Sequence, residues 1–276
     1  MGIEKIASDR KDKENIDLKK KRKRRRKIVV SRVQKLYEIC KKVFANCEPG
    51  VVPSPENIER VKAVLDKMTE ADVGLTPSMP YFKSTLSHRP PEITYLHIHE
   101  CDNFSIGIFC LPPKAVIPLH NHPGMTVFSK LLLGKMHIKS YDWADNLLRE
   151  STPNANIFDN GEGDRIGPRL AKLKVNSEFK APCKTSILYP ADGGNMHCFT
   201  ATTACAVLDV LGPPYCDPEG RHCQYYYDFP FVNFSVDGLS VPEEQHSEYA
   251  WLKEREKPED LTVAGALYTE PNLVLK

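Results

Sequence analysis

Two His-x-His pairs in this sequence have the spacing of a metal site. His97 and His99 occur in TYLHIHE, and His120 and His122 occur in IPLHNHPGM. Alternate side chains of a β-strand point to the same face, so either pair could direct two imidazoles at one metal ion. The spacing alone does not distinguish the two pairs, and the surrounding residues have to decide between them.

The alternation around the first pair argues against a metal site there. Thr94, Leu96 and Ile98 fall on the face opposite His97 and His99, and that face is apolar. An apolar face is expected to lie against the core, so we expect both histidines of this pair to face solvent.

The second pair has a setting that suits function. His120 and His122 lead into a tight Pro-Gly bend, a common setting for a functional loop on a rigid β scaffold. A third histidine, His197, follows a Gly-Gly turn that allows a tight return of the chain, and it precedes an apolar strand. We therefore expect His120, His122 and His197 to converge in a barrel mouth and to bind one metal ion.

The elements that must position these histidines are predicted to be short strands. After residue 93, short runs rich in β-branched and aromatic residues alternate with turn residues, which is typical of an all-β barrel or sandwich. Residues 145–168 interrupt the pattern and are predicted to form a long loop. The predicted strands are 93–99, 104–111, 127–133, 136–143, 171–174, 185–189, 198–202, 205–211 and 224–229.

Two amphipathic helices are predicted before the barrel. Apolar residues recur at three- and four-residue spacing from Val33 to Phe44. Ser54 is a good N-cap, and Pro55 suits the first position of a second helix, whose apolar face extends to Met68. The chain is thereby divided into a disordered basic tail at 1–29, a helical segment at 30–72, a barrel domain at 73–240 and an extension at 241–276 that packs on the barrel.

Composition limits the class of protein. With 276 residues and 41% hydrophobic content, the chain can form one substantial domain with extensions. We expect no signal peptide and no membrane association, because the first residues are charged and the apolar runs are short. Nine cysteines without a C-x-x-C pair are expected to be reduced intracellular thiols rather than a structural zinc site.

The charge of the chain is unevenly distributed. The formal net charge of +2 includes nine consecutive cations at 19–27, KKKRKRRRK, so the remaining residues are net negative. We therefore expect no direct nucleic-acid binding by the core. The basic block has the composition of a nuclear localisation signal, and we expect a nuclear and cytoplasmic location. The alternative is a solvated tail that binds anions loosely, because such a polar segment is expected to be disordered.

The histidine motifs resemble those of a known superfamily. The pattern Pro118-x-His120-x-His122, followed by Gly134 and Gly194-x-x-His197, is similar to the two metal motifs of the cupins. The resemblance implies a cupin-type double-stranded β-helix, or jelly-roll, barrel with the N-terminal helices packed on it.

The chain departs from the usual cupin pattern in an informative way. The first motif usually carries a Glu after its histidine pair, and this chain has Thr126 or Val127 at that spacing. In the second motif, Pro190 and Gly193 are one residue further apart than usual, and the final Asn is replaced near Ala201. The missing Glu resembles the three-histidine subclass of cupins, which contains the thiol dioxygenases.

Within that subclass the chain resembles the plant cysteine oxidases, relatives of the animal cysteamine dioxygenases. The resemblance covers about residues 30–240 and is carried by HNHPGM, YPADGGNMHCFTA, AVLDVLGPPY and EGRHCQYY together. It implies an Fe(2+) enzyme that uses O2 to oxidise the N-terminal cysteine of target proteins, transcription factors among them, to cysteine sulfinic acid. It further implies an N-degron pathway, in which oxidation marks the target for degradation, and a role in oxygen sensing.

The donor set suits such chemistry. Three neutral imidazoles leave the full 2+ charge on a metal ion, which should favour binding of a substrate as its thiolate. Imidazole sites also accept zinc, copper and nickel, so the ligands alone do not establish iron. Iron follows from the resemblance, since zinc has no redox chemistry.

Three further residues are candidates for catalytic roles. Asp209 lies in the apolar strand AVLDVLG, where an acid is costly without a partner. It either bonds to backbone amides or binds the substrate amine or a water near the metal. Tyr215 and Cys223 are expected near the same pocket, with packing as the alternative role.

Two other functions remain open from the sequence. A dioxygenase of free cysteine or cysteamine is one alternative, although no arginine stands out to hold the carboxylate of free cysteine. A non-enzymatic nuclear cupin that holds a metal ion is the other. We expect the protein to be a monomer.

Overall fold

The computed structural model describes residues 30–83, 90–147, 167–236 and 239–275 and consists mainly of β-strands. In the described part of the chain, no helix is long and apolar enough to cross a membrane. The strands are β1 (Ile93–Cys101), β2 (Phe104–Leu111), β3 (Val116–His120), β4 (Thr126–Leu133), β5 (Lys135–Trp143), β6 (Arg169–Lys180), β7 (Ser186–Leu188), β8 (Met196–Ala201), β9 (Cys205–Gly212), β10 (Tyr225–Pro230), β11 (Tyr249–Arg255) and β12 (Val263–Leu267).

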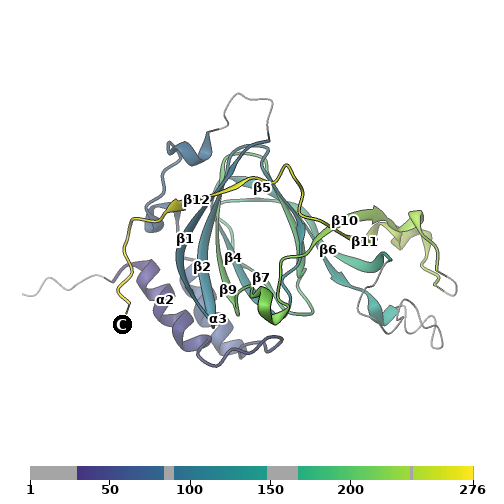
Figure 1. The fold of residues 1–276 in the computed structure, drawn as a ribbon, viewed down its shortest axis with the longest axis horizontal. Coiled ribbons are helices and arrows are strands. Elements are labelled where there is room, and N and C mark those ends of the chain that lie inside the picture. The colour runs from purple at the N-terminus through teal and green to yellow at the C-terminus, as the bar shows by residue number, and fades with distance from the viewer. Residues whose placement is uncertain (1–29, 84–89, 148–166, 237–238, 276) are drawn as a thin grey trace, which may run out of the picture. The chain divides into compact units, whose positions relative to one another are not determined.

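Two α-helices precede the strands, α2 (Arg32–Val43) and α3 (Pro55–Leu65). The predicted N-cap is confirmed, because the Ser54 hydroxyl accepts a hydrogen bond from the backbone N–H of Asn57 at 3.4 Å. The helices lie beside β1 and β2 (Figure 1). Short 3₁₀ helices occur in the connections: η1 (Glu70–Val73), η2 (Pro80–Phe82), η3 (Asp217–Glu219), η4 (Phe231–Asn233) and η5 (Glu243–Glu248).

The first sheet has the order β12-β1-β2-β9-β4-β7 and is covered on both faces. One face packs against the helices, where Leu36 and Phe44 join Leu208 and Val210 of β9 in one apolar cluster. The other face looks into the barrel, where Val207 belongs to a second cluster. Burial of both faces explains why β9 is an almost unbroken apolar run, and it places Asp209 on the inner face because side chains alternate.

The second set of strands closes on itself in the order β10-β11-β6-β5-β8-β3. The pair that closes the ring is Tyr225 on β10 opposite His120 on β3. On its other edge, β3 pairs with β8, where His120 lies opposite His197. The closure of the ring therefore fixes the position of His120 between two neighbouring strands.

The predicted all-β barrel with N-terminal helices is confirmed. Strands β11 and β12 were not predicted, and β3 is missing from the predicted strand ranges, although the segment before the Pro-Gly bend was interpreted as a short strand or turn. β3 is only five residues long and contains Pro118, which lacks a backbone N–H, and the apolar pattern of β12 is weak. Strands β11 and β12 pair with β10, β6 and β1, so the segment 241–276 adds strands to both sheets. The division into four parts stays a prediction, and its tail at 1–29 lies outside the described residues, as does most of the predicted loop at 145–168.

Candidate metal centre

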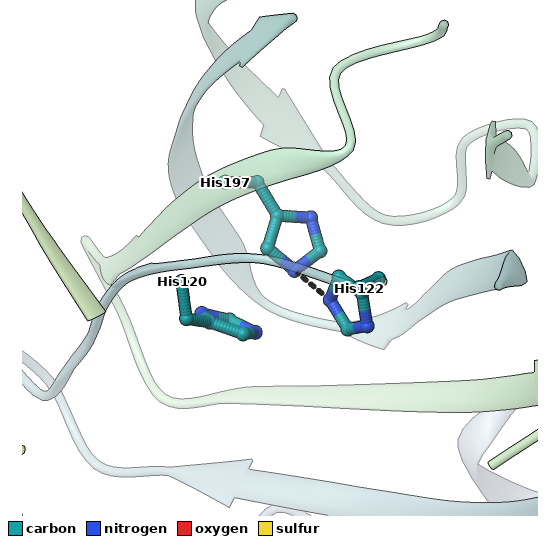
Figure 2. A group of neighbouring side chains, drawn as sticks. All are labelled: His120, His122 and His197. Carbon is teal, nitrogen blue, oxygen red and sulfur yellow. Dashed lines mark hydrogen bonds between the residues drawn. The ribbon is translucent and has the colours of Figure 1, made fainter. Parts of the chain in front are cut away.

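The three histidines predicted as metal ligands lie together in the interior of the barrel (Figure 2). His120 ends β3, His122 lies in the turn just after it, and His197 lies near the start of β8. Their exposed fractions are 8%, 4% and 3%. Antiparallel pairing of His120 with His197 brings together residues that are 77 positions apart in the sequence.

The imidazole rings face one another at distances that suit one ion. Ring centroids are 4.7 Å apart for His120 and His197, 4.7 Å for His122 and His197, and 4.9 Å for His120 and His122. The Nε2 atoms of His122 and His197 are 3.0 Å apart, and one nitrogen from each ring lies within 4.8 Å of the others. Within the described part of the chain, no carboxylate joins this group.

Hydrogen bonds fix which nitrogen of two rings carries the proton. Nδ1 of His120 lies 2.8 Å from the carbonyl oxygen of Pro118 and must donate, because a carbonyl has no hydrogen to give. The Tyr215 hydroxyl donates to the carbonyl oxygen of Asn121 at 2.7 Å, so it accepts from Nδ1 of His122 at 3.0 Å. The Nε2 atoms of His120 and His122 therefore carry the lone pairs that a metal ion requires.

Burial also keeps the cluster uncharged. Desolvation lowers the pKa of His120 to about 4, although its bond to Pro118 acts in the opposite direction. The pKa values of His122 and His197 are well below the ordinary value. Burial is the main cause, and the proximity of His120 is the second. Three neutral imidazoles, two of them with lone pairs assigned to Nε2 by their hydrogen bonds, fit a divalent ion.

The histidines lie in the wall of a cavity of about 350 Å³ that also contains all three predicted catalytic residues. Its wall is mostly apolar and aromatic, and among the described residues it contains two acids and no lysine or arginine. The lining residues are Tyr95, Glu100, Ser105, Gly107, Phe109, Ile117, His120, His122, His197, Phe199, Asp209, Leu211, Pro214, Tyr215, Cys223, Tyr225, Leu261 and Val263.

Asp209 is the buried acid of this cavity. It lies on β9, opposite Gly107 of β2 and Ser129 of β4. Burial raises the pKa of its carboxyl to about 7, and the Ser129 hydroxyl lowers it only in part, at a geometry too poor for a regular hydrogen bond. Its Oδ1 has no hydrogen-bond partner in the described part of the chain, so the alternative role, a bond to backbone amides, is not found at this oxygen.

Tyr215 and Cys223 lie on the same wall. Burial raises the pKa of the Tyr215 hydroxyl well above its ordinary value. Burial also raises the pKa of the Cys223 thiol, and the neighbouring hydroxyls of Tyr215 and Tyr225 oppose that shift. Both side chains are therefore protonated at neutral pH, Tyr215 as a hydrogen-bond donor and Cys223 as a neutral thiol.

Comparison with known proteins places this arrangement in a family. Residues 64–273 match the family model PCO_ADO. The plant cysteine oxidase 2 of Arabidopsis thaliana is 60% identical over 256 residues, which cover 92% of this chain and 88% of that protein. The human 2-aminoethanethiol dioxygenase is 31% identical over 244 residues, which cover 83% of this chain and 84% of that protein.

This chain belongs to the PCO_ADO family. The resemblance expected from the sequence motifs is thereby confirmed. Among solved structures, a protein from Klebsiella pneumoniae with a double-stranded β-helix domain aligns with a TM-score of 0.30 and 14% identity, covering 48% of this chain and 84% of that one. The fold of this family member is established by its own hydrogen-bonded barrel.

The first histidine pair takes no part in the centre of this PCO_ADO protein. His97 is exposed, as expected, but His99 is half-buried against Tyr37, with ring centroids 4.8 Å apart, and against Phe104. The expectation that both face solvent is therefore wrong for His99. The pairing of β1 with β2 shifts its register between His97 and His99, and this shift moves them out of the alternation assumed from the sequence.

Sequence reasoning missed several residues around the centre. Tyr95 and Tyr225 line the cavity from β1 and β10. Tyr225 lies within the motif EGRHCQYY and Tyr95 within TYLHIHE, but neither tyrosine was singled out as a site residue. Asn195 bonds to the backbone of His122, and Asp142 bonds to the backbone of Asn195. A buried Asn two residues before His197 is a signal that could have been noticed, whereas Asp142 is brought near by strand pairing and carries no local signal.

Proposed function

We propose that this protein uses O2 and Fe(2+) to oxidise the N-terminal cysteine of target proteins to cysteine sulfinic acid. The general activity follows from the family, because its members make the chain an oxidoreductase of the cysteine dioxygenase type. In the balanced reaction, a thiol and one O2 give a sulfinic acid, and both oxygen atoms end on sulfur. The metal, the protein substrate and the biological setting form the proposal.

His120, His122 and His197 would hold the ion. When bound, iron would supply the one-electron chemistry that joins a thiol to O2, which zinc lacks. The three neutral rings add no negative charge, so the site favours a substrate that gives up its thiol proton. Closure of the barrel around the three rings keeps bulk water away from this point.

The observation that carries the substrate assignment is the charge of the cavity. Asp209 and Glu100 line it, and no lysine or arginine does so among the described residues. Free cysteine brings a carboxylate that would face two acids without a cation. The N-terminal cysteine of a protein brings an ammonium group and an uncharged peptide bond, and both are compatible with this wall.

Asp209 is the residue best placed to bind that ammonium group. Its Oδ1 has no hydrogen-bond partner in the described residues, and a pKa of about 7 lets the carboxyl either hold or release a proton near neutrality. Tyr215 orients His122 through Nδ1, and Cys223 offers a neutral thiol to the substrate. These are the roles we propose for the three residues.

The 2-aminoethanethiol dioxygenases favour one alternative. The human enzyme of that name is 31% identical to this chain. Its named substrate carries an amine and a thiol but no carboxylate, so it would meet the same favourable charges in this cavity. Oxidation of cysteamine itself is therefore the second candidate function.

A wider setting is also part of the proposal. Oxidation of an N-terminal cysteine would feed an N-degron degradation pathway, and its dependence on O2 would make the protein a sensor of hypoxia. The basic block at 19–27 has the composition of a nuclear address, which suits transcription factors as targets. A nuclear and cytoplasmic location and a monomeric state are proposed with it.

Mass spectrometry of a Cys-initiating peptide tests the reaction directly. Iron-loaded protein in air should add two oxygen atoms to the peptide, and removal of O2 or of iron should abolish the gain. The same peptide with an acetylated amino terminus should react far more slowly, because it has no ammonium group for Asp209. If the free-amine peptide stays unoxidised, the proposed reaction is wrong, and faster turnover of cysteamine would favour the second candidate.

Cell imaging tests the proposed location. A fluorescent fusion of the full chain should appear in nucleus and cytoplasm. Replacement of the cations at 19–27 with Gln should deplete the nuclear signal. An unchanged nuclear signal would remove the assignment of this block as an address.

A further inference from the structure

His122 is the ligand that the sheets support least. It lies beyond the end of β3, in the turn that leads to β4, and among the described residues no strand pairing holds its backbone. Within the turn, its carbonyl oxygen accepts from the backbone N–H of Met125 at 3.2 Å. The side chain of Asn195 holds the backbone of His122 instead. Its side-chain oxygen accepts from the backbone N–H of His122 at 3.1 Å, and its side-chain amide donates to the carbonyl oxygen of His122 at 2.9 Å.

The Asn195 side chain is buried, and both hydrogens of its amide group are donated to backbone carbonyl oxygens. Its amide also donates to the carbonyl oxygen of Tyr189 at 2.9 Å, so one side chain ties two separate stretches of backbone together. Such a bidentate arrangement fixes both the position and the orientation of the peptide of His122. Asn195 also lies two residues before His197, so it links the backbone of one ligand to the strand that carries another.

Asp142 in turn holds Asn195. It lies on β5 with 7% of its surface exposed, and its Oδ1 accepts from the backbone N–H groups of both Gly194 and Asn195, each at 2.9 Å. Gly194 has a φ of +85°, and a Cβ there would overlap Ser140 of β5, so only glycine allows this approach to the strand. Lys174 lies 3.5 Å from the other oxygen of Asp142.

We propose that Asn195 and Asp142 are positioning residues that set the metal affinity of the three-histidine centre through the backbone of His122. The proposal rests on the proposed metal centre. Neither side chain lines the cavity, so neither touches the substrate or the reacting atoms. Together they connect the backbone of His122, which lies outside β3, to the rigid strand β5. In this way they set the distance between His122 and His197.

Metal binding by Asn195→Ala and Asp142→Ala tests this inference. The probe is Co(2+) alone, titrated into metal-free protein, with affinity measured by competition against a chelator. Both variants should bind about 10- to 100-fold more weakly than wild type, the range that loss of an outer hydrogen-bond partner of a ligand costs. Asp142→Asn keeps an oxygen for the two N–H groups and should restore most of the affinity.

A spectroscopic readout separates positioning from general loss of stability. At saturating Co(2+), the visible absorption bands of Asn195→Ala should shift relative to wild type, because they report ligand geometry. Asn176→Ala, which changes an exposed Asn on β6, should leave both affinity and spectrum unchanged. If Asn195→Ala does not fold, Asn195→Asp serves instead, since it keeps the acceptor for His122 and loses both donors.

The outcomes distinguish this inference from the proposed function. If wild-type protein does not bind Co(2+) at the histidines, the metal centre itself is wrong. If wild type binds and the alanine variants match its affinity within about twofold and its spectrum, the positioning role is wrong while the centre stands. Weakened affinity with a shifted spectrum, restored by Asp142→Asn, supports the inference.

Discussion

The Tyr215 hydroxyl lies 3.0 Å from Nδ1 of His122 while it donates to the carbonyl oxygen of Asn121 at 2.7 Å. A hydroxyl has one hydrogen, so its use on the carbonyl leaves an acceptor for the imidazole N–H. This single contact directs the lone pair of His122 toward the other two histidines. The chemistry of the centre therefore depends on a side chain that has no need to touch the ion.

Tyr215→Phe should weaken metal binding about 10- to 100-fold, because Nδ1 of His122 loses its acceptor in a buried site. Titration of metal-free protein with Co(2+) measures the change. Tyr141→Phe is the matched control. The Tyr141 hydroxyl donates to Asp228 at 2.9 Å, and Tyr141 is not among the residues that line the cavity. Equal affinities for Tyr215→Phe and wild type would contradict the assigned tautomer.

His197→Ala should weaken metal binding by more than about 100-fold. It removes a nitrogen that binds the metal, whereas Tyr215→Phe removes only a hydrogen-bond partner of such a ligand. We expect less than one ion per chain under conditions that load wild type fully, and no oxidation of a Cys-initiating peptide. Metal analysis after gel filtration gives the stoichiometry. His222→Ala, at an exposed position, should keep both metal and activity, and full loading of His197→Ala would argue against the centre.

Asp209→Asn should change how stability depends on pH. The folded pKa is about 7 and the ordinary value is 3.8, so between them the folded state keeps a proton that the unfolded chain has released. The free energy of unfolding therefore falls as pH rises through this window, by at most about 4 kcal/mol. The Asn variant lacks this loss and should gain stability over wild type as pH rises from about 4 to about 8.

Urea unfolding of metal-free protein at several pH values measures the effect. Comparison of the variant with wild type at each pH cancels the contribution of the buried histidines, whose lowered pKa values destabilise both proteins in acid. A difference in stability that stays constant with pH would show that Asp209 titrates normally.

Gly107→Ala should impair substrate binding more than metal binding. A Cβ at this position on β2 would overlap the ring and hydroxyl of Tyr95, which must then move within the cavity. We expect a several-fold rise in KM for a Cys-initiating peptide and a Co(2+) affinity close to wild type. Among the described residues, the ring contacts of Tyr95 are with His97 and Phe109 and not with the three metal-site histidines. Gly265→Ala, where a Cβ meets no atom within 4 Å, is the control.

Much of the barrel could be predicted from local patterns. The predicted strand at 104–111 has the same bounds as β2, and the one at 205–211 differs from β9 by one residue. Both strands are largely apolar segments with clear turns around them. β12 could not be predicted in this way, because its short sequence VAGAL becomes a strand only through its pairing with β1. Such pairing depends on contacts between distant parts of the chain.

The sequence by itself determined the donor types, the His-x-His spacing and the motifs that identify the family. Only the tertiary structure decided that His197 lies opposite His120 and that Asn195 and Asp142 support His122. It likewise decided that the described wall of the cavity contains two acids and no lysine or arginine. The register shift at His99 was likewise hidden from the sequence. Local patterns fix which residues can form strands, whereas burial, charge and ligand convergence arise when strands far apart in the chain pair across the barrel.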